Sequence, residues 1–365
     1  MKYQIEKQSK VPAYLQLYEQ IRKEIISEVY PLNSKLPSKR LMTEETGISI
    51  ITVEHAYALL QEEGYIQSRE RSGYFVCFRK NDGFAGSTDV RNEGYGNAPI
   101  SAEQHEFPFS VLSKTMRKVI SEHGEEILER SPNEGTLQLR LAISRYLERS
   151  RGIKADASQI IIGAGSEYLY NLIAGLLGRD KIYAIETPSY KRIEEVYQSI
   201  GIKYEKLTLG RDGITSEALK NSKADVLHVT PYRSYPSGVS ASASKRHEYL
   251  RWAKGQGRYI IEDDYESEFS VLRKPEDTLF SQSEQDNVIY MNTFSKTISP
   301  ALRTGYMILP KHLVKSFEQA LGFYSCTVPT YIQFVLAELI DQNDFERHIN
   351  RVRRNKRKQL TKTSE

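Results

Sequence analysis

The sequence predicts an α/β domain with a mostly parallel sheet, preceded by a winged helix-turn-helix module. Brief apolar runs, separated mostly by helical stretches, predict the α/β domain, because this alternation is typical of parallel sheets covered by helices. The runs lie at residues 159–162, 181–185, 225–229, 258–261 and 288–291. A stretch rich in Gly, Asn, Ser and Asp at residues 79–104 predicts a linker between the two parts.

The chain has 365 residues, of which 39% are hydrophobic and 27% charged. This composition is typical of globular proteins, and the length favours two or more domains. The apolar runs are all shorter than the ~18–20 residues of a membrane-spanning helix, and residues 1–10 lack the apolar core of a signal peptide. Two cysteines, Cys77 and Cys326, are too few for a disulfide framework or a zinc cluster. We expect a cytoplasmic protein with no membrane partner and no metal.

The net charge of +4 is unevenly distributed along the chain. Residues 351–365 contain 7 Lys/Arg and 1 Asp/Glu, whereas residues 1–80 contain 12 Lys/Arg and 10 Asp/Glu. The rest of the chain is therefore net acidic. A polyanionic partner is expected to bind the N-terminal segment or the tail.

Residues 1–78 have the spacing of a helix-turn-helix followed by a short hairpin. A first helix is predicted from apolar residues at helical intervals. Ser38 and Ser49 are suitable N-caps for two further short helices, and two helices joined by so short a turn form a helix-turn-helix. Short strands at 64–66 and 73–76 enclose a basic loop, which predicts a wing.

Lys296 follows the apolar run at 288–291, and Thr293, Ser295 and Arg303 lie near it in the sequence. A desolvated lysine amine is the nucleophile that forms a Schiff base with a carbonyl compound. Hydroxyl groups and a guanidinium can hold a phosphate dianion. Pyridoxal phosphate needs both functions, so this segment predicts a site for that cofactor.

The same cofactor needs a carboxylate that pairs with its protonated ring nitrogen. Asp263 ends an apolar strand and Tyr265 follows, at the carboxyl end of a strand where α/β sheets collect ligand groups. Gly165 and Ser166 lie between a strand and a helix, where free backbone amides bind phosphate. We expect Glu167 to point away from the phosphate, because its charge has the same sign.

The turn at 187–192 contributes a further aromatic ring and a further cation. Tyr190 is suited to stack on the pyridine ring, and Arg192 is suited to meet a substrate carboxylate. A purely structural role for this turn remains an open alternative.

Four segments of the N-terminal part resemble the GntR-type winged-helix domain over nearly its full length. They are LPSKR at 36–40, TV at 52–53, LLQEEGYI at 59–66 and SGYFV at 72–76. The resemblance implies binding to double-stranded DNA. It places Ser38, Lys39 and Arg40 at the phosphates, Ser49, Ile50, Ile51 and Thr52 in the major groove, and Arg71 and Gly73 at the wing.

One departure from this family concerns base recognition. The family often has arginine where this chain has Ile50 and Glu54. Bidentate contacts between arginine and guanine are the commonest specific base contact. Without them, Thr52, His55 and the isoleucines remain to contact thymine methyl groups. Alternatively, the basic residues named above are ordinary solvated charges.

Residues 107–350 resemble the large domain of a fold-type I, class I/II aminotransferase. The blocks IIEDDYESEF at 260–269 and TFSKT at 293–297 are similar to those of MocR/GabR-type transcription regulators, in which a winged helix, a linker and an aminotransferase domain follow in this order. NEGTL at 133–137 and YPSG at 235–238 fit the same subfamily.

This second resemblance implies a role for each candidate residue. It makes Lys296 the Schiff-base (aldimine) lysine, Asp263 the partner of the pyridinium nitrogen and Tyr265 the donor to the ring 3′-oxygen. Tyr190 is then the stacking ring, and Arg192 is the contact to an effector carboxylate. The phosphate site is formed by Gly165, Ser166, Thr293, Ser295 and Arg303. It also implies a head-to-tail homodimer.

The predicted organisation is a winged helix at 1–78, a linker at 79–106, a large domain at 107–350 and a basic tail at 351–365. In the aminotransferase family the chain continues into a small α/β domain, so we expect a C-terminal truncation that leaves only the start of that domain. The tail is then either a solvent-facing helix or a phosphate-binding segment. A second departure is PYRSY at 231–235, which replaces a usual His-Gln pair.

We therefore predict a pyridoxal-phosphate-dependent regulator of transcription that senses an amino compound, or pyridoxal phosphate itself, at Lys296. The alternative is an active aminotransferase with an appended DNA-binding module, although little turnover is expected without the small domain because the substrate would be poorly oriented. A third possibility is a degenerate protein that neither holds the cofactor nor regulates.

Overall fold

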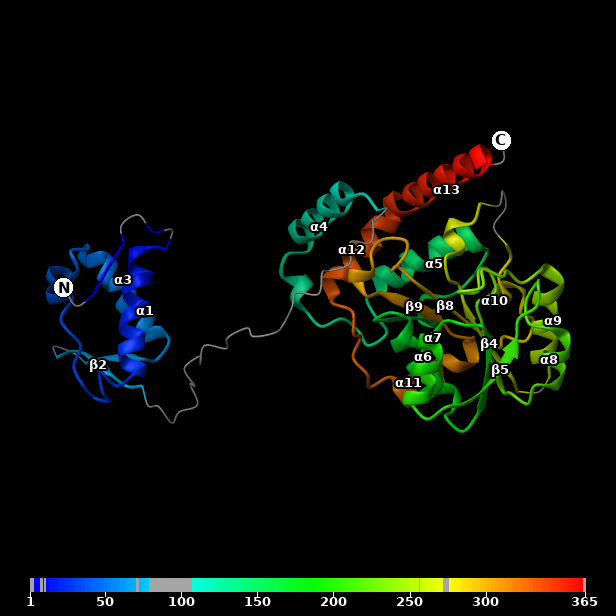
Figure 1. The fold of residues 1–365 in the computed structure, drawn as a ribbon, viewed down its shortest axis with the longest axis horizontal. Helices are drawn as coiled ribbons and strands as arrows, with labels where there is room; N and C mark the ends of the chain where they lie inside the picture. Colours follow the sequence, from blue (N-terminus) through cyan, green and yellow to red (C-terminus); the bar gives the residue numbers. More distant parts are fainter. Residues whose placement is uncertain are drawn as a thin grey trace. The chain divides into compact units, whose positions relative to one another are not determined.

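The computed structural model describes residues 3–6, 9, 11–69, 72–78, 107–255, 257–271 and 276–363, with side chains to residue 360. The chain divides into two compact units, Met1–Ala102 and Glu103–Glu365, and each is described by itself (Figure 1). The predicted linker at 79–106 and the wing residue Arg71 lie outside the described residues. No helix in the described ranges is both long and apolar enough to cross a membrane.

The first unit is a winged helix. Its elements are α1 (Ala13–Ile26), α2 (Lys39–Thr46), α3 (Ile50–Glu62), β1 (Ile66–Arg69) and β2 (Gly73–Val76). Both predicted caps are present, because the side chain of Ser38 accepts from the Leu41 amide and that of Ser49 accepts from the Thr52 amide. The strands β1 and β2 pair antiparallel and form the wing.

Helices α1 and α3 form the core of this unit. Leu17 and Ile21 of α1 are fully buried and pack in one cluster with Val53, Tyr57 and Leu60 of α3. These apolar residues recur at helical intervals, so each helix buries one face and leaves the other exposed. The exposed face of α3 is thereby left to contact a partner.

The second unit is built on a seven-stranded sheet with the order β3-β9-β8-β7-β6-β4-β5. The strands are β3 (Ile160–Gly163), β4 (Ile182–Thr187), β5 (Lys203–Thr208), β6 (Val226–Val229), β7 (Tyr259–Asp263), β8 (Val288–Thr293) and β9 (Gly305–Ile308). Strands β5, β4, β6, β7 and β8 pair parallel with one another, and β9 pairs antiparallel with both of its neighbours, β3 and β8. The prediction of a mostly parallel sheet is confirmed.

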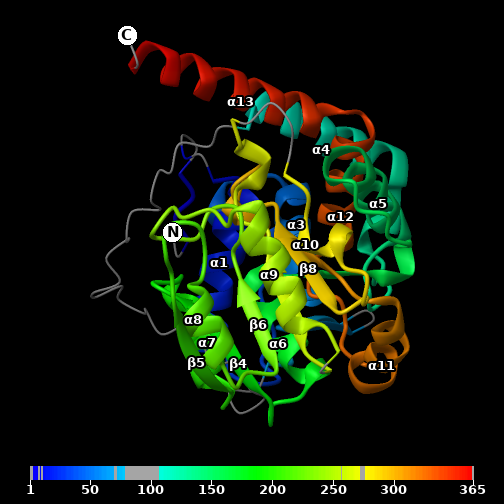
Figure 2. The same cartoon turned by 90° about the vertical axis from the view of Figure 1, so that its right-hand side faces the viewer.

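Helices cover both faces of this sheet. They are α4 (Phe109–His123), α5 (Leu137–Arg151), α6 (Ser166–Leu177), α7 (Lys191–Ser199), α8 (Ser216–Asn221), α9 (Ala243–Ala253), α10 (Leu279–Gln282), α11 (Lys311–Leu321), α12 (Thr330–Asp341) and α13 (Asp344–Thr363). Successive strand residues enter opposite layers: Ile161 packs with α6, α7 and α11, whereas Ile160 and Ile162 pack with α5 and α12. Helix α9 covers part of the sheet in Figure 2.

Helix α13 runs without interruption across the predicted boundary at residue 350. Val352 is buried, and Arg353 Nε donates to the backbone oxygen of Glu268 at 2.5 Å. Arg357 Nε donates to the Val271 oxygen at 2.9 Å. The helix is therefore not wholly solvent-facing, because one side of it holds the segment that follows β7.

Candidate functional site

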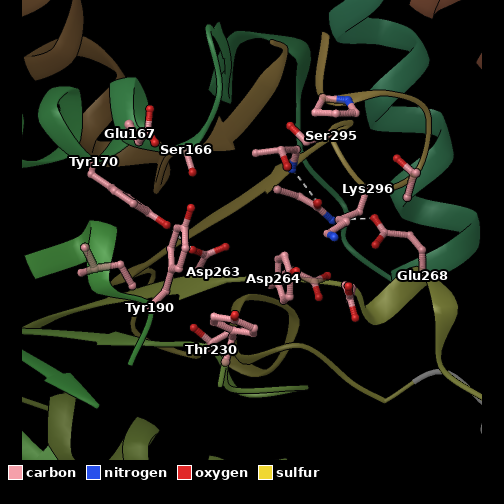
Figure 3. A pocket seen from close by; sticks show the side chains of 18 of the residues that line it. Ser166, Glu167, Tyr170, Tyr190, Thr230, Asp263, Asp264, Glu268, Ser295 and Lys296 are labelled. Carbon is pink, nitrogen blue, oxygen red and sulfur yellow. Dashed lines mark hydrogen bonds between the residues drawn. The ribbon is translucent and has the colours of Figure 1, made fainter. Parts of the chain in front are cut away.

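A cavity of about 370 Å³ lies at one edge of the sheet (Figure 3). Strand β3 runs in the same direction as β8, because both are antiparallel to β9. The carboxyl ends of β3, β4, β6, β7 and β8 therefore meet at this edge. Each strand places at least one lining residue at or just beyond its end, among them Ser166, Tyr190, Thr230, Asp263 and Lys296 respectively.

The structure brings most of the candidate cofactor residues to this cavity. Those that line it are Ser166, Tyr190, Asp263, Tyr265, Thr293, Ser295, Lys296 and Arg303. Gly165 borders it, because a Cβ on this residue would lie 3.3 Å from Nη2 of Arg303, and its φ of +89° is one that side-chain-bearing residues rarely adopt. Arg192 is not among the lining residues, and its Nε lies 3.5 Å from Glu167 Oε1.

The Lys296 side chain is exposed to the cavity from the turn after β8. None of the ion pairs recorded for the described residues involves its amine, although carboxylates line the same cavity. An amine without a permanent carboxylate partner is free to react with a carbonyl group. Figure 3 shows Lys296 on the same side of the cavity as Glu268, with Ser166 and Tyr170 opposite.

A buried tyrosine hydroxyl and a buried histidine ring lie beside the Asp263 carboxylate. The Tyr170 hydroxyl donates to Asp263 Oδ2 at 2.6 Å, and His228 Nε2 lies 3.8 Å from the same oxygen. The Tyr197 hydroxyl lies 2.8 Å from Nδ1 of His228 and orients that ring. In the described part of the chain, the Tyr170 and His228 contacts are both to Oδ2, which leaves Oδ1 available to a ligand.

Burial is the largest cause of the raised pKa of two tyrosine hydroxyls in this cavity. Desolvation first, and then the Asp263 charge, raise the pKa of Tyr170 well above its ordinary value. Desolvation also raises the pKa of Tyr265 far above its usual range. Both hydroxyls therefore stay protonated and can act as hydrogen-bond donors.

The opposite end of the cavity is suited to an anion. The amino end of α6 lies beside Arg303, and a helix N-terminus favours negative charge. The expectation that Glu167 points away from this end is wrong. Its Oε2 lies 3.2 Å from Nη2 of Arg303 and its Oε1 lies near Arg192, because two guanidinium groups and the first turn of a helix attract a carboxylate.

The donor set of the cavity fits pyridoxal phosphate. One end has a guanidinium, hydroxyls and helix amides, which suit a phosphate dianion. The other end has the Asp263 carboxylate, which suits a pyridinium nitrogen. The Lys296 amine lines the same cavity. Gly165 leaves room where a Cβ would meet Arg303.

A second group of carboxylates, Asp264 and Glu268, also lines the cavity and was not found from the sequence. Arg151 Nη2 lies 3.1 Å from Asp264 Oδ2, and both side chains are buried. The Asn292 amide donates to Glu268 Oε1 at 2.6 Å. Burial, with the Asp264 charge second, raises the pKa of Glu268 to about 7.

Tyr170 and His228 were also missed, and only one of them had a signal. Tyr170 follows Ser166 by four residues, so both lie on the same face of a helix. His228 pairs with Ile261 across two strands, and Asp263 lies two residues further on the same face. That relationship depends on β6 being the neighbour of β7, which no local pattern reports.

The segment at 231–235, where the chain departs from the family pattern, forms a buried hydrogen bond at Ser234 and an ion pair at Arg233. Ser234 Oγ donates to Glu186 Oε2 at 2.6 Å, and burial raises the pKa of Glu186 to about 8. Arg233 is paired with Glu266 at 2.8 Å and does not line the cavity. Ser234 thus supports the end of β4, whereas Tyr235 of the same segment lines the cavity next to Tyr190.

The candidate DNA residues lie on the first unit. Ser38 and Ser49 cap α2 and α3, Arg40 is exposed, and Lys39 Nζ lies 3.0 Å from Glu54 Oε1. The exposed fractions of Ile50 and Ile51 are 43% and 73%, and the Thr52 hydroxyl lies 2.8 Å from Ser49 Oγ. Gly73 begins β2 with φ of +109°.

Two family models match the chain. The model "Bacterial regulatory proteins, gntR family" matches residues 13–76, and "Aminotransferase class I and II" matches residues 97–363.

Several curated proteins are similar to nearly the whole chain. The HTH-type transcriptional regulator YdeL of Bacillus subtilis is 33% identical, with 95% of this chain and 77% of the relative covered. The probable rhizopine catabolism regulatory protein MocR of Rhizobium meliloti is 28% identical, over 96% and 76%. The pyridoxine biosynthesis transcriptional regulator PdxR of Corynebacterium glutamicum is 26% identical, over 93% and 75%.

Solved aminotransferases share the fold of the second unit. An archaeal alanine:glyoxylate aminotransferase aligns with a TM-score of 0.61 at 22% identity, covering 67% of this chain and 62% of that one. The kynurenine aminotransferase of Pyrococcus horikoshii aligns with a TM-score of 0.61 at 23% identity, covering 68% and 64%. The chain thus spans less than two thirds of these two structures.

Proposed function

We propose a mode of action on the premise that the chain belongs to the MocR/GabR family of transcriptional regulators, in which a GntR-type DNA-binding domain precedes an aminotransferase class I/II domain. The chain is a DNA-binding regulator, and the cofactor of its aminotransferase fold is pyridoxal phosphate. The observation that carries the proposal is that Lys296 and Asp263 line one cavity, from adjacent parallel strands.

Each cavity residue then has a role toward the cofactor. When bound, pyridoxal phosphate supplies an aldehyde carbon that accepts an amine and a ring that withdraws electrons. Lys296 would hold the cofactor through its amine, and Asp263 Oδ1 would accept a hydrogen bond from the protonated ring nitrogen. Tyr265 donates to the ring oxygen, and Tyr190 stacks on the ring. Proximity of these groups in one cavity supports the assignment.

The phosphate is held at the other end of the cavity. Arg303 provides the positive charge, and Ser166, Thr293 and Ser295 provide hydroxyl groups. Gly165 allows the guanidinium to approach the backbone of this turn. The amino end of α6 adds its free amides and its dipole.

An amino compound that competes with the Lys296 amine is the proposed signal. Binding of the compound frees Lys296, and Arg192, which lies beside the lining residue Glu167, meets its carboxylate. The effector shifts the population of conformations that bind DNA, by its difference in affinity for them. A variant of this proposal has pyridoxal phosphate itself as the effector, and the relative named for pyridoxine biosynthesis supports considering it.

The assembly and organisation of the protein complete the proposal. The working unit is a homodimer, so that two winged helices can contact two half-sites on DNA. The domains are 1–78, 107–350 and 351–365, joined after the first by the linker 79–106. A protein that binds chromosomal DNA acts in the cytoplasm, and this location is part of the proposal.

The test uses the full chain and the visible absorbance of bound pyridoxal phosphate. Lys296→Ala should abolish covalent attachment, measured by borohydride reduction and mass spectrometry of peptides. Lys311→Ala, at an exposed lysine on α11 outside the cavity, is the matched control. Attachment at another lysine, or equal attachment in Lys296→Ala, would overturn the assignment.

A second measurement separates a regulator from an enzyme. The chain is mixed with pyridoxal phosphate, a panel of amino donors and a keto acid, and both turnover and DNA binding are measured. We expect DNA binding that responds to the amine or to the cofactor, with little turnover. Fast multiple turnover without DNA binding would favour an active aminotransferase instead.

A further inference from the structure

The exposed start of helix α3 is apolar. The exposed fractions of Ile50 and Ile51 are 43% and 73%, and that of Leu41 on α2 is 45%. Over its whole length, α3 contains no arginine, lysine or asparagine. Its one glutamine, Gln61, lies in the last turn. The amino end of the helix that a winged helix-turn-helix inserts into the major groove therefore lacks the side chains that most often recognise guanine and adenine by paired hydrogen bonds.

The polar groups at this end of α3 already have partners. Ser49 Oγ accepts from the Thr52 amide, and the two hydroxyls share a hydrogen bond at 2.8 Å. The Glu54 carboxylate is paired with Lys39. The His55 ring packs against Tyr14 in a tilted arrangement, with 4.6 Å between ring centroids. The apolar side chains are thus the ones free to make new contacts.

We propose that Ile50 and Ile51 recognise thymine by packing on its C5-methyl group in the major groove, so that A·T pairs occupy the base positions they face. The thymine methyl is the one apolar group that bases present in this groove, and apolar side chains are suited to it. Lys39 and Arg40 at the start of α2 contact phosphates, which position the helix without adding sequence preference. The inference rests on the proposed DNA-binding residues and adds the base that they select.

Nucleic acid fits this apolar patch better than a protein partner does. The patch lies at the amino end of the recognition helix of a matched gntR-family segment, next to two basic residues. Apolar contact at the centre with cations at the margin is the arrangement of a major-groove surface. If the patch bound a protein instead, the affinity of the chain for DNA would not depend on the thymine methyl groups.

The probe is DNA selected by the full chain, with pyridoxal phosphate present, from a pool of duplexes with random sequence. We expect enrichment of half-sites with A·T pairs in the major groove facing α3. In the selected duplex each thymine is then replaced by deoxyuridine, which removes only the C5-methyl group. Affinity should fall about fourfold for each contacted thymine, the factor for one buried methylene-sized group, and should not change at the other positions.

Variants connect the effect to the isoleucines. Ile51→Ala should weaken binding to the thymine duplex, yet lose nothing further on the deoxyuridine duplex, because the methyl group and the side chain form one contact. Val29→Ala, at a residue 57% exposed outside the helix-turn-helix, should retain the full difference between the two duplexes. Alanine is the better helix former, and thermal unfolding of each variant checks that the winged helix is intact.

The outcomes distinguish this inference from the proposed function. If no duplex is enriched, the proposed DNA-binding residues and the inference both fail. If duplexes are enriched but deoxyuridine changes nothing at any position, or if Ile51→Ala and Ile50→Ala both keep the wild-type difference, the thymine contact is overturned while DNA binding stands.

Discussion

The hydroxyl of Tyr170 donates a hydrogen bond to Oδ2 of Asp263 at 2.6 Å, and both groups are buried. Tyr170 lies on α6, the helix that begins at the anion end of the cavity, whereas Asp263 ends β7. One helix therefore contributes to both ends of the site. It supports the carboxylate at one end and presents its amino terminus at the other.

Removing the Tyr170 hydroxyl is expected to weaken cofactor binding. Tyr170→Phe leaves Asp263 in place but removes a hydrogen bond to a charged group, typically about 1.5–3 kcal/mol. The dissociation constant for pyridoxal phosphate, measured by absorbance titration, should rise by roughly tenfold or more. Tyr183→Phe is the control, since that hydroxyl donates to the backbone oxygen of Gly178 at 3.4 Å and does not contact Asp263. Equal effects of both variants would contradict the assigned role.

Removing the Glu167 charge is expected to strengthen cofactor binding. The Glu167 carboxylate is paired with Arg303 at the end of the cavity that suits an anion, so its negative charge opposes the binding of a phosphate dianion. Partly exposed pairs of this kind contribute about 0.2–1 kcal/mol, so Glu167→Gln should lower the dissociation constant for pyridoxal phosphate by roughly two- to fivefold. Pyridoxal, which lacks the phosphate, is the matched ligand. An equal gain with pyridoxal would show that the effect does not come from the phosphate.

The buried Glu186 carboxyl predicts a pH dependence of stability. Burial raises its pKa in the folded state to about 8, so the folded chain binds a proton there that the unfolded chain has released. The contribution of this carboxyl to the free energy of unfolding is fully present below about pH 4.5 and is lost as the pH rises to about 8. In Glu186→Gln, the free energy of unfolding should therefore fall by less between these pH values, with a difference from the wild type on the order of 1–3 kcal/mol.

Trp252 is the only tryptophan in the chain and lies in the second unit, so its fluorescence follows urea unfolding of that unit at several pH values. Glu318→Gln, at an exposed position on α11, should leave the pH dependence as in the wild type. A Glu186→Gln variant with the wild-type slope would remove Glu186 as the cause.

The hydrogen bonds from α13 predict a local change in mobility. Arg353 and Arg357 donate to the backbone oxygens of Glu268 and Val271, and Glu268 lines the cavity. The double variant Arg353→Ala, Arg357→Ala should speed hydrogen–deuterium exchange in residues 265–271 by roughly tenfold, the loss of about 1.4 kcal/mol of local stability. Arg354→Ala, on the exposed side of α13, is the control. Unchanged exchange in the double variant would show that α13 does not hold this segment.

Local chemistry was enough to find the ends of the cofactor site. Lys296 and Asp263 each follow an apolar strand, and parallel strands bring such positions to one edge whatever their order. The caps of α2 and α3 were also predicted from single serines, since capping depends on neighbouring residues only. Two strands were missed. Strand β5 is a largely exposed edge strand with polar residues. Strand β9 follows β8 with no α-helix between them, so the alternation of strands and helices did not reveal it.

The supports of the site depended on the tertiary structure. His228 reaches Asp263 because β6 pairs with β7, and Arg353 reaches Glu268 across 85 residues. Glu167 was expected to point away from the phosphate site because its charge would repel a phosphate, yet its carboxylate is paired with Arg303 and lies near Arg192. The two guanidinium groups attract it, and only the tertiary structure brings them together. The sequence by itself determined which groups carry the chemistry, since each such group has a local signature. Only the packing of strands and helices decided which side chains hold them, because contacts between distant segments leave no mark in the spacing of residues.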